Sequence, residues 1–176
     1  MARYEINHDC KIIEQDSALC KDLDNMLQRL FSQFGWNAKI TDKQGSCRTI
    51  ELNDANGNSE SITVYCGAIR NELRNPYEKK IQLGNSSDPR TNKKESTVII
   101  GVYVFEENDD LEDAIFVGYP IVDSKNYGAN PSIRGTFVNQ LLIKAKNDGF
   151  VYDEEHNTVG FRSEFAHYYL KNHYKL

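Results

Sequence analysis

Residues 97–121 read TVIIGVYVFEENDDLEDAIFVGYPI, two strongly apolar segments joined by an acidic connection. Residues 97–105 and 114–121 are rich in Val, Ile, Tyr and Phe, which favour β-strands. Outward from this stretch, the same signals predict strands at residues 36–41, 48–52, 61–69 and 78–83, and a hairpin at 150–152 and 158–162. Few helices separate these strands, whereas a parallel sheet needs a helix after nearly every strand. The sequence therefore predicts a mainly β fold of the α+β class.

Helices are predicted at three places around these strands. Residues 16–34 repeat apolar side chains at three- and four-residue spacing, as one amphipathic helix does. A second helix is predicted over residues 136–147, with Gly149 as its stop, and a short third one from Ser163. We therefore expect an open antiparallel β pseudobarrel of about seven strands with two or three flanking helices.

The composition excludes several classes of protein. The chain has 176 residues, of which 39% are hydrophobic, so it can form a core and is too apolar to be disordered. No apolar run is long enough to span a membrane and no secretory signal is visible, so we expect a cytoplasmic protein without a membrane partner. Because Cys10, Cys20, Cys47 and Cys66 lack zinc-site spacing, we expect reduced thiols and no metal.

The net charge of −5 hides a segregated charge pattern. Residues 68–94 hold seven basic and three acidic residues, and residues 124–147 hold four basic residues and no acid. The acids gather instead in residues 106–113. Nucleic acid responds to local potential, so two basic segments allow DNA binding despite the acidic total. A solvated surface of uneven charge is the alternative.

Two long polar connections lie between the predicted elements. The first, RNELRNPY at residues 70–77, joins two strands, and the second, VDSKNYGANPSIRG at residues 122–135, leads to the second helix. Arg and Lys donate to guanine, Asn pairs with adenine, and Ser, Tyr and backbone amides hold phosphates. Asn, Gly, Pro and Ser are also ordinary turn residues. Long loops on a rigid scaffold are nevertheless often functional, which favours a binding role.

The order of these segments resembles the plant B-three DNA-binding pseudobarrel and, more closely, the specificity domains of bacterial type II restriction endonucleases. The residues that carry the resemblance are 70–83 (RNELRNPYEKKIQL), 101–121, 123–135 (DSKNYGANPSIRG) and 149–170 (GFVYDEEHNTVGFRSEFAHYYL). It implies a DNA-binding barrel over residues 61–176, with residues 1–60 as an extension packed on it. It also implies two arms, residues 70–77 and 123–134, that grip double-stranded DNA from the major groove, and a nuclease domain or subunit as partner.

The resemblance assigns roles to individual side chains. The implied base contacts are Arg70, Glu72, Arg74, Asn75 and Tyr77 on the first arm and Lys125, Asn126, Tyr127 and Asn130 on the second. The implied phosphate contacts are Lys79, Lys80, Arg90, Lys93, Lys94, Ser132 and Arg134. The implied function is sequence-specific target recognition in a restriction system, with no catalytic residue and no cofactor in this chain.

A metal-dependent nuclease is the main alternative. Glu78, Lys79 and Lys80 fit an E-x-K pattern, in which a carboxylate binds a metal and a lysine stabilises the attacking water. Asp54 is the candidate for the second metal-binding acid, although it lies in an Asn- and Gly-rich turn where Asp is common. A protein–protein adaptor that uses the acidic residues 106–113 is a third hypothesis.

Overall fold

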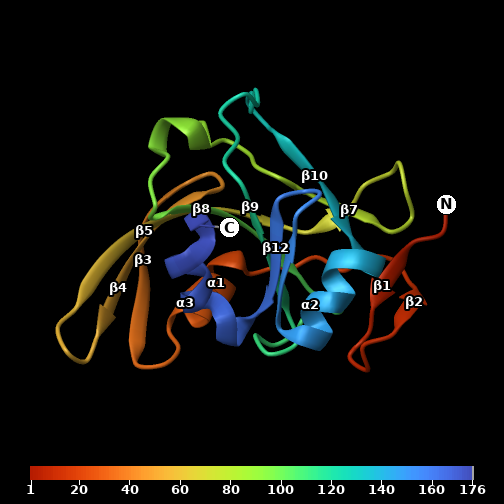
Figure 1. Ribbon diagram of the computed structural model, residues 1–176, viewed down its shortest axis with the longest axis horizontal. Coiled ribbons are helices and arrows are strands. Elements are labelled where there is room, and N and C mark those ends of the chain that lie inside the picture. Colours follow the sequence, from red (N-terminus) through yellow and green to blue (C-terminus); the bar gives the residue numbers. More distant parts are fainter. Residues whose placement is uncertain (176) are drawn as a thin grey trace.

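The structure is a computed structural model that describes residues 1–175, in which three sheets are combined with three α-helices (Figure 1). The largest sheet has seven strands in the order β11-β12-β9-β8-β5-β4-β3. These strands are β3 (Trp36–Gln44), β4 (Cys47–Asp54), β5 (Ser59–Ala68), β8 (Thr97–Tyr103), β9 (Ile115–Tyr119), β11 (Phe150–Asp153) and β12 (Thr158–Arg162). A second sheet, β10-β7-β6, contains β6 (Arg70–Asn71), β7 (Glu78–Gln82) and β10 (Ser132–Phe137). A small hairpin joins β1 (Tyr4–Ile6) to β2 (Ile12–Glu14).

The mainly β, α+β class is confirmed, and every strand predicted from the sequence corresponds to a strand of the structure. The open pseudobarrel is not confirmed: the described chain forms no closed barrel, and the large sheet has β11 and β3 at its two edges. One pairing also differs from the antiparallel expectation, because β5 and β8 run parallel. The chain between them carries β6 and β7 to another layer, so it acts as a crossover although it contains no long helix.

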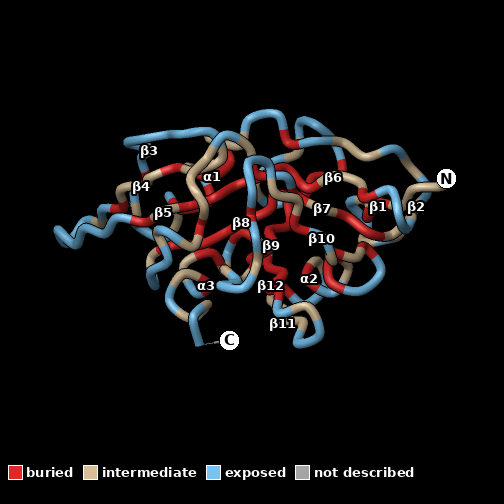
Figure 2. Tube along the Cα trace, turned by 90° about the horizontal axis from the view of Figure 1, so that it is seen from above, coloured by how far each residue is buried: buried red, intermediate tan, exposed pale blue. Residues whose placement is uncertain are grey.

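The central strand β8 is buried along its whole length because both faces of the large sheet are covered (Figure 2). Successive side chains of a strand point to opposite faces. Val98, Ile100 and Val102 accordingly join the core beneath α1 (Leu23–Phe31) and α3 (Ala166–Asn172). Ile99 and Tyr103 join a second core, which is covered by β7, β10 and α2 (Ile143–Asp148). The first sixty residues contribute α1, β3 and β4 to this same sheet and core.

Two helices start later than the sequence predicts. Helix α1 begins at Leu23 because the Asp22 carboxylate caps it by accepting a hydrogen bond from the Asn25 backbone amide. The predicted second helix is replaced at its start by the end of β10 and by a π-helical turn, η2 (Val138–Leu142). The stop was predicted correctly, since α2 ends at Asp148 and Gly149 caps it with a φ of 88°, which suits glycine.

Gly118 of β9 leaves room for Tyr169 of α3 to pack closely on the sheet. A Cβ atom at Gly118 of β9 would overlap the ring of Tyr169, which is buried under the sheet. We expect Gly118→Ala to lower the free energy of unfolding by about 1–3 kcal/mol, because a filled core cannot take an added methyl group without strain. Urea unfolding followed by circular dichroism measures this, with Ser124→Ala on an exposed loop as the control. An equally stable Gly118→Ala protein would contradict this packing.

His167 makes the contact between α3 and α1 sensitive to pH. Its ring stacks on Trp36 with centroids 5.6 Å apart, and Nε2 lies 2.9 Å from the carbonyl oxygen of Phe31. Burial lowers the pKa of His167 below its ordinary 6.5. The unfolded chain therefore binds this proton more readily, so the stabilisation is complete above pH 6.5 and is lost as the pH falls through the folded-state pKa. We expect the free energy of unfolding of His167→Gln to change less with pH than that of the parent protein. Unfolding measured above pH 6.5 and below the folded-state pKa checks this.

A candidate nucleic-acid interface on the three-stranded sheet

The two predicted arms lie on the same side of the molecule. The first arm is β6 and its loop to β7, and the second is the loop between β9 and β10. Strand β7 pairs with both β6 and β10, so the three-stranded sheet joins the two arms. In Figure 1 the first loop (yellow) lies at the upper right and the second loop (teal) at the top of the molecule. Local sequence patterns contain no sign of this pairing, because the arms belong to distant parts of the chain.

Each arm has one exposed arginine that forms an ion pair with a buried glutamate. Nε of Arg134 donates to the carboxylate of Glu72, and Nε and Nη2 of Arg74 donate to that of Glu78. Both glutamates are buried, whereas 60% of the Arg74 side chain and 48% of the Arg134 side chain are exposed. Glu78 also accepts from the backbone amide of Gly135 at 3.2 Å, which ties β10 to β7. The two guanidinium groups are therefore fixed in place with their free edges toward solvent.

The ion pairs stabilise the charged forms of Glu72 and Arg74. The Arg134 guanidinium holds the pKa of the Glu72 carboxyl below its ordinary value, and the hydrogen bond from Arg74 to Glu78 raises the pKa of Arg74. The Lys80 ammonium lies 3.8 Å from Glu72 and adds a third cation to the cluster.

Arg70 adds a fourth cation on the same face of the sheet. Arg70 is the register partner of Lys80, and residues directly opposite in an antiparallel pair share a face. Its Nε is buried and has no hydrogen-bond partner within the described chain. Buried polar groups in proteins are nearly always paired, so this unpaired Nε sets Arg70 apart from the other cations of the cluster. The outer face of the sheet thus holds four cations, Arg70, Arg74, Lys80 and Arg134, around two carboxylates.

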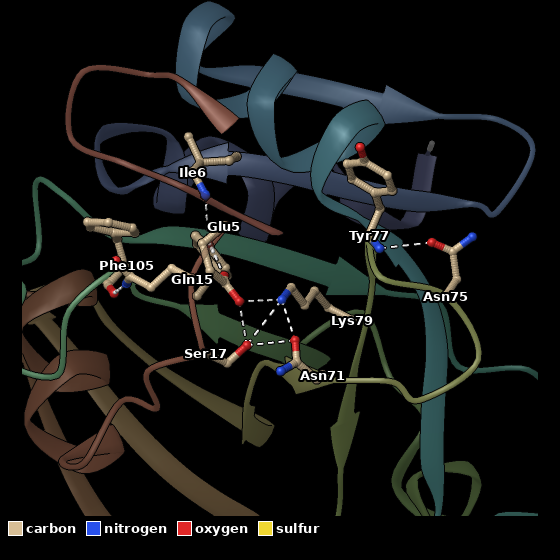
Figure 3. A network of polar contacts seen from close by, with 10 residues as sticks. Glu5, Ile6, Gln15, Ser17, Asn71, Asn75, Tyr77, Lys79 and Phe105 are labelled. Atoms are coloured by element: carbon tan, nitrogen blue, oxygen red, sulfur yellow. Dashed lines mark hydrogen bonds and ion pairs between the residues drawn. The ribbon is translucent and has the colours of Figure 1, made fainter. Parts of the chain in front are cut away.

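Lys79 lies on the opposite face of β7 and is fully buried (Figure 3). Its ammonium contacts the carboxylate of Glu5, Oδ1 of Asn71 and, at 3.1 Å, the hydroxyl of Ser17. The hydroxyl of Tyr103 donates to the same Glu5 carboxylate at 2.5 Å. Burial lowers the pKa of Lys79, although the charge of Glu5 opposes this effect. The ammonium has no route to a DNA phosphate, so Lys79 lies outside the interface for which the sequence proposed it.

The N-terminal segment supports the base of the first arm. Besides the contact of Glu5 with Lys79, the ring of Tyr4 stacks on that of Tyr77 with centroids 4.5 Å apart. The backbone amide of Tyr4 also donates to the carbonyl of Pro76 at 3.2 Å. Tyr77, a predicted base contact, is thus held against β1, and Asn75 turns its side chain back onto the Tyr77 amide at 2.8 Å. Sequence reasoning missed this role of the N-terminal residues.

The second loop is supported from within by two residues predicted as base contacts. Tyr127 is buried, and its hydroxyl accepts from the backbone amide of Val122 at 3.0 Å. Nζ of Lys125 lies 5.5 Å from the centre of the Tyr127 ring and donates to the carbonyl of Ser132 at 3.3 Å. Burial lowers the pKa of Lys125. The predicted base contacts that remain exposed on this loop are the amides Asn126 and Asn130.

A further basic segment lies beside the start of the second loop. Arg90 belongs to the short helix η1 (Pro89–Asn92), where Asp88 orients its guanidinium. Nη1 of Arg90 donates to the carbonyl of Asp123 at 3.1 Å, and Nζ of Lys93 lies 3.1 Å from the Asp123 carboxylate. Lys94 follows as an exposed cation. Two predicted phosphate contacts, Arg90 and Lys93, therefore lie beside the second arm.

The residues of the nuclease alternative do not meet. The Asp54 carboxylate accepts from the backbone amides of Asn56 and Asn58 in its own turn. Figure 1 places this turn between β4 and β5 at the opposite end of the molecule from β7, which carries Glu78 and Lys80. The carboxylate of Glu78 is occupied by Arg74. The metal site expected from the E-x-K pattern is therefore absent from the part of the chain that the structure describes.

The comparison with protein families identifies the chain. The model of the family described as methylase-associated X1 matches residues 60–170, which is more than half of the chain. The chain belongs to the methylase-associated X1 family. Membership fits a restriction-modification context, and the matched segment contains both arms. No curated protein and no solved structure matches significantly.

Among residues 1–175, no helix is long and apolar enough to cross a membrane.

Proposed function

We propose that this methylase-associated X1 chain binds double-stranded DNA sequence-specifically, as the target-recognition part of a restriction-modification system. The observation that carries the proposal is the pair of exposed arginines, Arg74 and Arg134, each held by a buried glutamate on one sheet face. A guanidinium fork fits both phosphate oxygens and the major-groove edge of guanine. Because the carboxylates fix the forks before binding, little side-chain freedom is lost in the complex.

The proposed contacts follow from the placement of each side chain. Base edges are read by Arg74, Asn75, Asn126 and Asn130, which are exposed on the two arms, and by the half-buried Arg70. Phosphates are held by the flanking groups, Lys80, Arg90, Lys93, Lys94, Ser132 and Arg134. Glu72 orients Arg134. Tyr77, Lys125 and Tyr127 support the arms from behind. A two-armed grip of this kind is what the resemblance to B-three-like specificity domains implies, and the major groove admits such a ribbon.

A methylase or a nuclease of the same system is the proposed protein partner. The description of the family associates it with methylases. Within this chain the nuclease residues do not assemble, so we assign the chain recognition and leave the chemistry to the partner.

Selection of bound duplexes from a random pool, with and without methylated cytosine, tests this function. We expect one enriched motif, and we expect binding without divalent metal because the proposed contacts are side-chain donors. If the folded protein enriched no sequence from either pool, the recognition function would be wrong. Cleavage of the pool on addition of magnesium would favour the nuclease alternative instead.

A further inference from the structure

A cavity of about 520 Å³ lies at the foot of the second arm. Its walls come from the end of β9 and the residues after it, from β11 and β12, from α3 with the following turn η4 (His173–Lys175), and from residues 93–97. Figure 1 shows α3 and the C-terminal end below the second loop. We propose that this cavity receives a nucleobase swung out of the duplex that the two arms hold. The inference rests on the proposed function, because the duplex supplies the base.

The walls suit a planar aromatic ring. Tyr152 of β11 and Tyr174 of η4 contribute to the lining from two separate elements. Tyr169 and His173 continue the aromatic wall, with ring centroids 5.4 Å apart. All four nucleobases stack on such side chains, because each base has an aromatic face. Enzymes that extrude a base hold it between aromatic or apolar groups. The volume lies within the usual range for small-molecule sites, roughly 300–1,000 Å³.

Polar groups in the lining can read the edge of the base. The hydroxyl of Tyr152 donates to Oδ1 of Asn157 at 2.7 Å, which fixes the orientation of this amide. Nδ2 of Asn157 then remains as a donor toward a ligand. Nε2 of His173 lies 2.5 Å from the carbonyl oxygen of Glu95 and carries the proton of that hydrogen bond, so Nδ1 is the free acceptor of the neutral ring. One donor and one acceptor suit the mixed hydrogen-bonding edge of a base.

Cations at the cavity link it to the DNA backbone. Lys93 and Lys94 both belong to the lining, and Lys93 also contacts Asp123, the third residue after Pro120 in the segment that leaves the cavity for the second arm. A DNA strand bound along the second arm would therefore bring its phosphates close to Lys93 and Lys94 at the cavity. Aromatic walls beside cations match a ring that carries a phosphate. A free nucleotide has the same chemistry, so the experiment must separate the two sources.

A mismatch scan of the full chain tests the inference. Duplexes of the selected sequence that carry a single mismatch at successive positions are compared with the matched duplex by fluorescence anisotropy. Unpairing costs least at a mismatch, so a protein that extrudes a base should bind about tenfold tighter when the mismatch falls on that base. We expect this gain at one position, and we expect Tyr174→Ala to remove it. Tyr168→Ala changes a similarly exposed tyrosine of the preceding helix α3, outside the cavity, and should retain the gain.

The possible results separate the inference from the proposed function. Binding that requires Arg74 but shows no gain at any mismatch, or a gain that survives Tyr174→Ala, would overturn the cavity assignment and leave DNA recognition intact. Absence of all duplex binding would overturn both. Titration with free deoxynucleoside monophosphates distinguishes the sources: saturable binding that depends on Tyr174, without a mismatch gain, would show a nucleotide site and contradict the swung-out base. Circular dichroism confirms that each variant is folded.

Discussion

Replacing Lys79 with methionine is expected to lower the free energy of unfolding by about 3–5 kcal/mol. The Lys79 and Glu5 side chains are each only 1% exposed and form an ion pair. Methionine keeps most of the volume but leaves the Glu5 carboxylate buried without its opposite charge, and an uncompensated buried charge is strongly destabilising. Guanidinium chloride unfolding followed by circular dichroism measures the loss.

Lys80→Met provides the matched control, one residue along the same strand. The Lys80 ammonium lies 3.8 Å from Glu72 with 21% of its side chain exposed, so its removal should cost at most about 1 kcal/mol. The double variant Glu5→Leu with Lys79→Met removes both charges, and it should lose much less than the sum of the two single changes. Equal stability of Lys79→Met and Lys80→Met, or simple additivity in the double variant, would contradict the buried network.

Replacing Arg74 or Arg134 with alanine is expected to weaken duplex binding by about 10- to 100-fold, the range for loss of one well-placed guanidinium contact. The two changes act on opposite arms and on different glutamates. Arg134→Lys should also bind weakly, because an ammonium cannot reproduce the fork geometry. Fluorescence anisotropy with the selected duplex measures each affinity at fixed salt.

Lys39→Ala on β3 is the control for the loss of a positive charge. Lys39 is exposed on an edge strand of the large sheet, away from the three-stranded sheet that joins the arms (Figure 1). The affinity of the Lys39→Ala protein for the duplex should therefore change little. If Arg74→Ala and Arg134→Ala both bound as tightly as Lys39→Ala, the arms would not be the DNA contacts.

Local patterns explain which parts of the fold could be predicted. The seven strands of the large sheet, strand β7 and the stop at Gly149 follow from composition and turn residues within a few positions. Strands β1, β2, β6 and β10 were not predicted. The parallel pairing of β5 with β8 and the pairing of β7 with β10 join distant segments. Local periodicity carries no information about such partners, so the expected pseudobarrel is not confirmed although the predicted strands are present.

The candidate site divides in the same way. The loops were found from charge and length, and Arg74 and Arg134 are exposed on them. The inward position of Lys79 follows from strand alternation with the buried Ile81, once β7 is treated as a strand with one buried face. Its partner could not be found in this way, because Glu5 is 74 positions away in the sequence. The support of the first arm by the N-terminal residues is therefore a tertiary feature.

The salt dependence of duplex affinity tests DNA recognition by the two arms most directly. The folded chain is titrated with the selected duplex at several salt concentrations from about 50 to 300 mM, and log K is plotted against log salt. Five lysine and arginine side chains are proposed to hold phosphates, so we expect a straight line with a slope of roughly −4 to −5, and a slope reduced by about one for Arg134→Ala. No binding at the lowest salt, or an affinity that does not change with salt, would contradict DNA recognition by this surface.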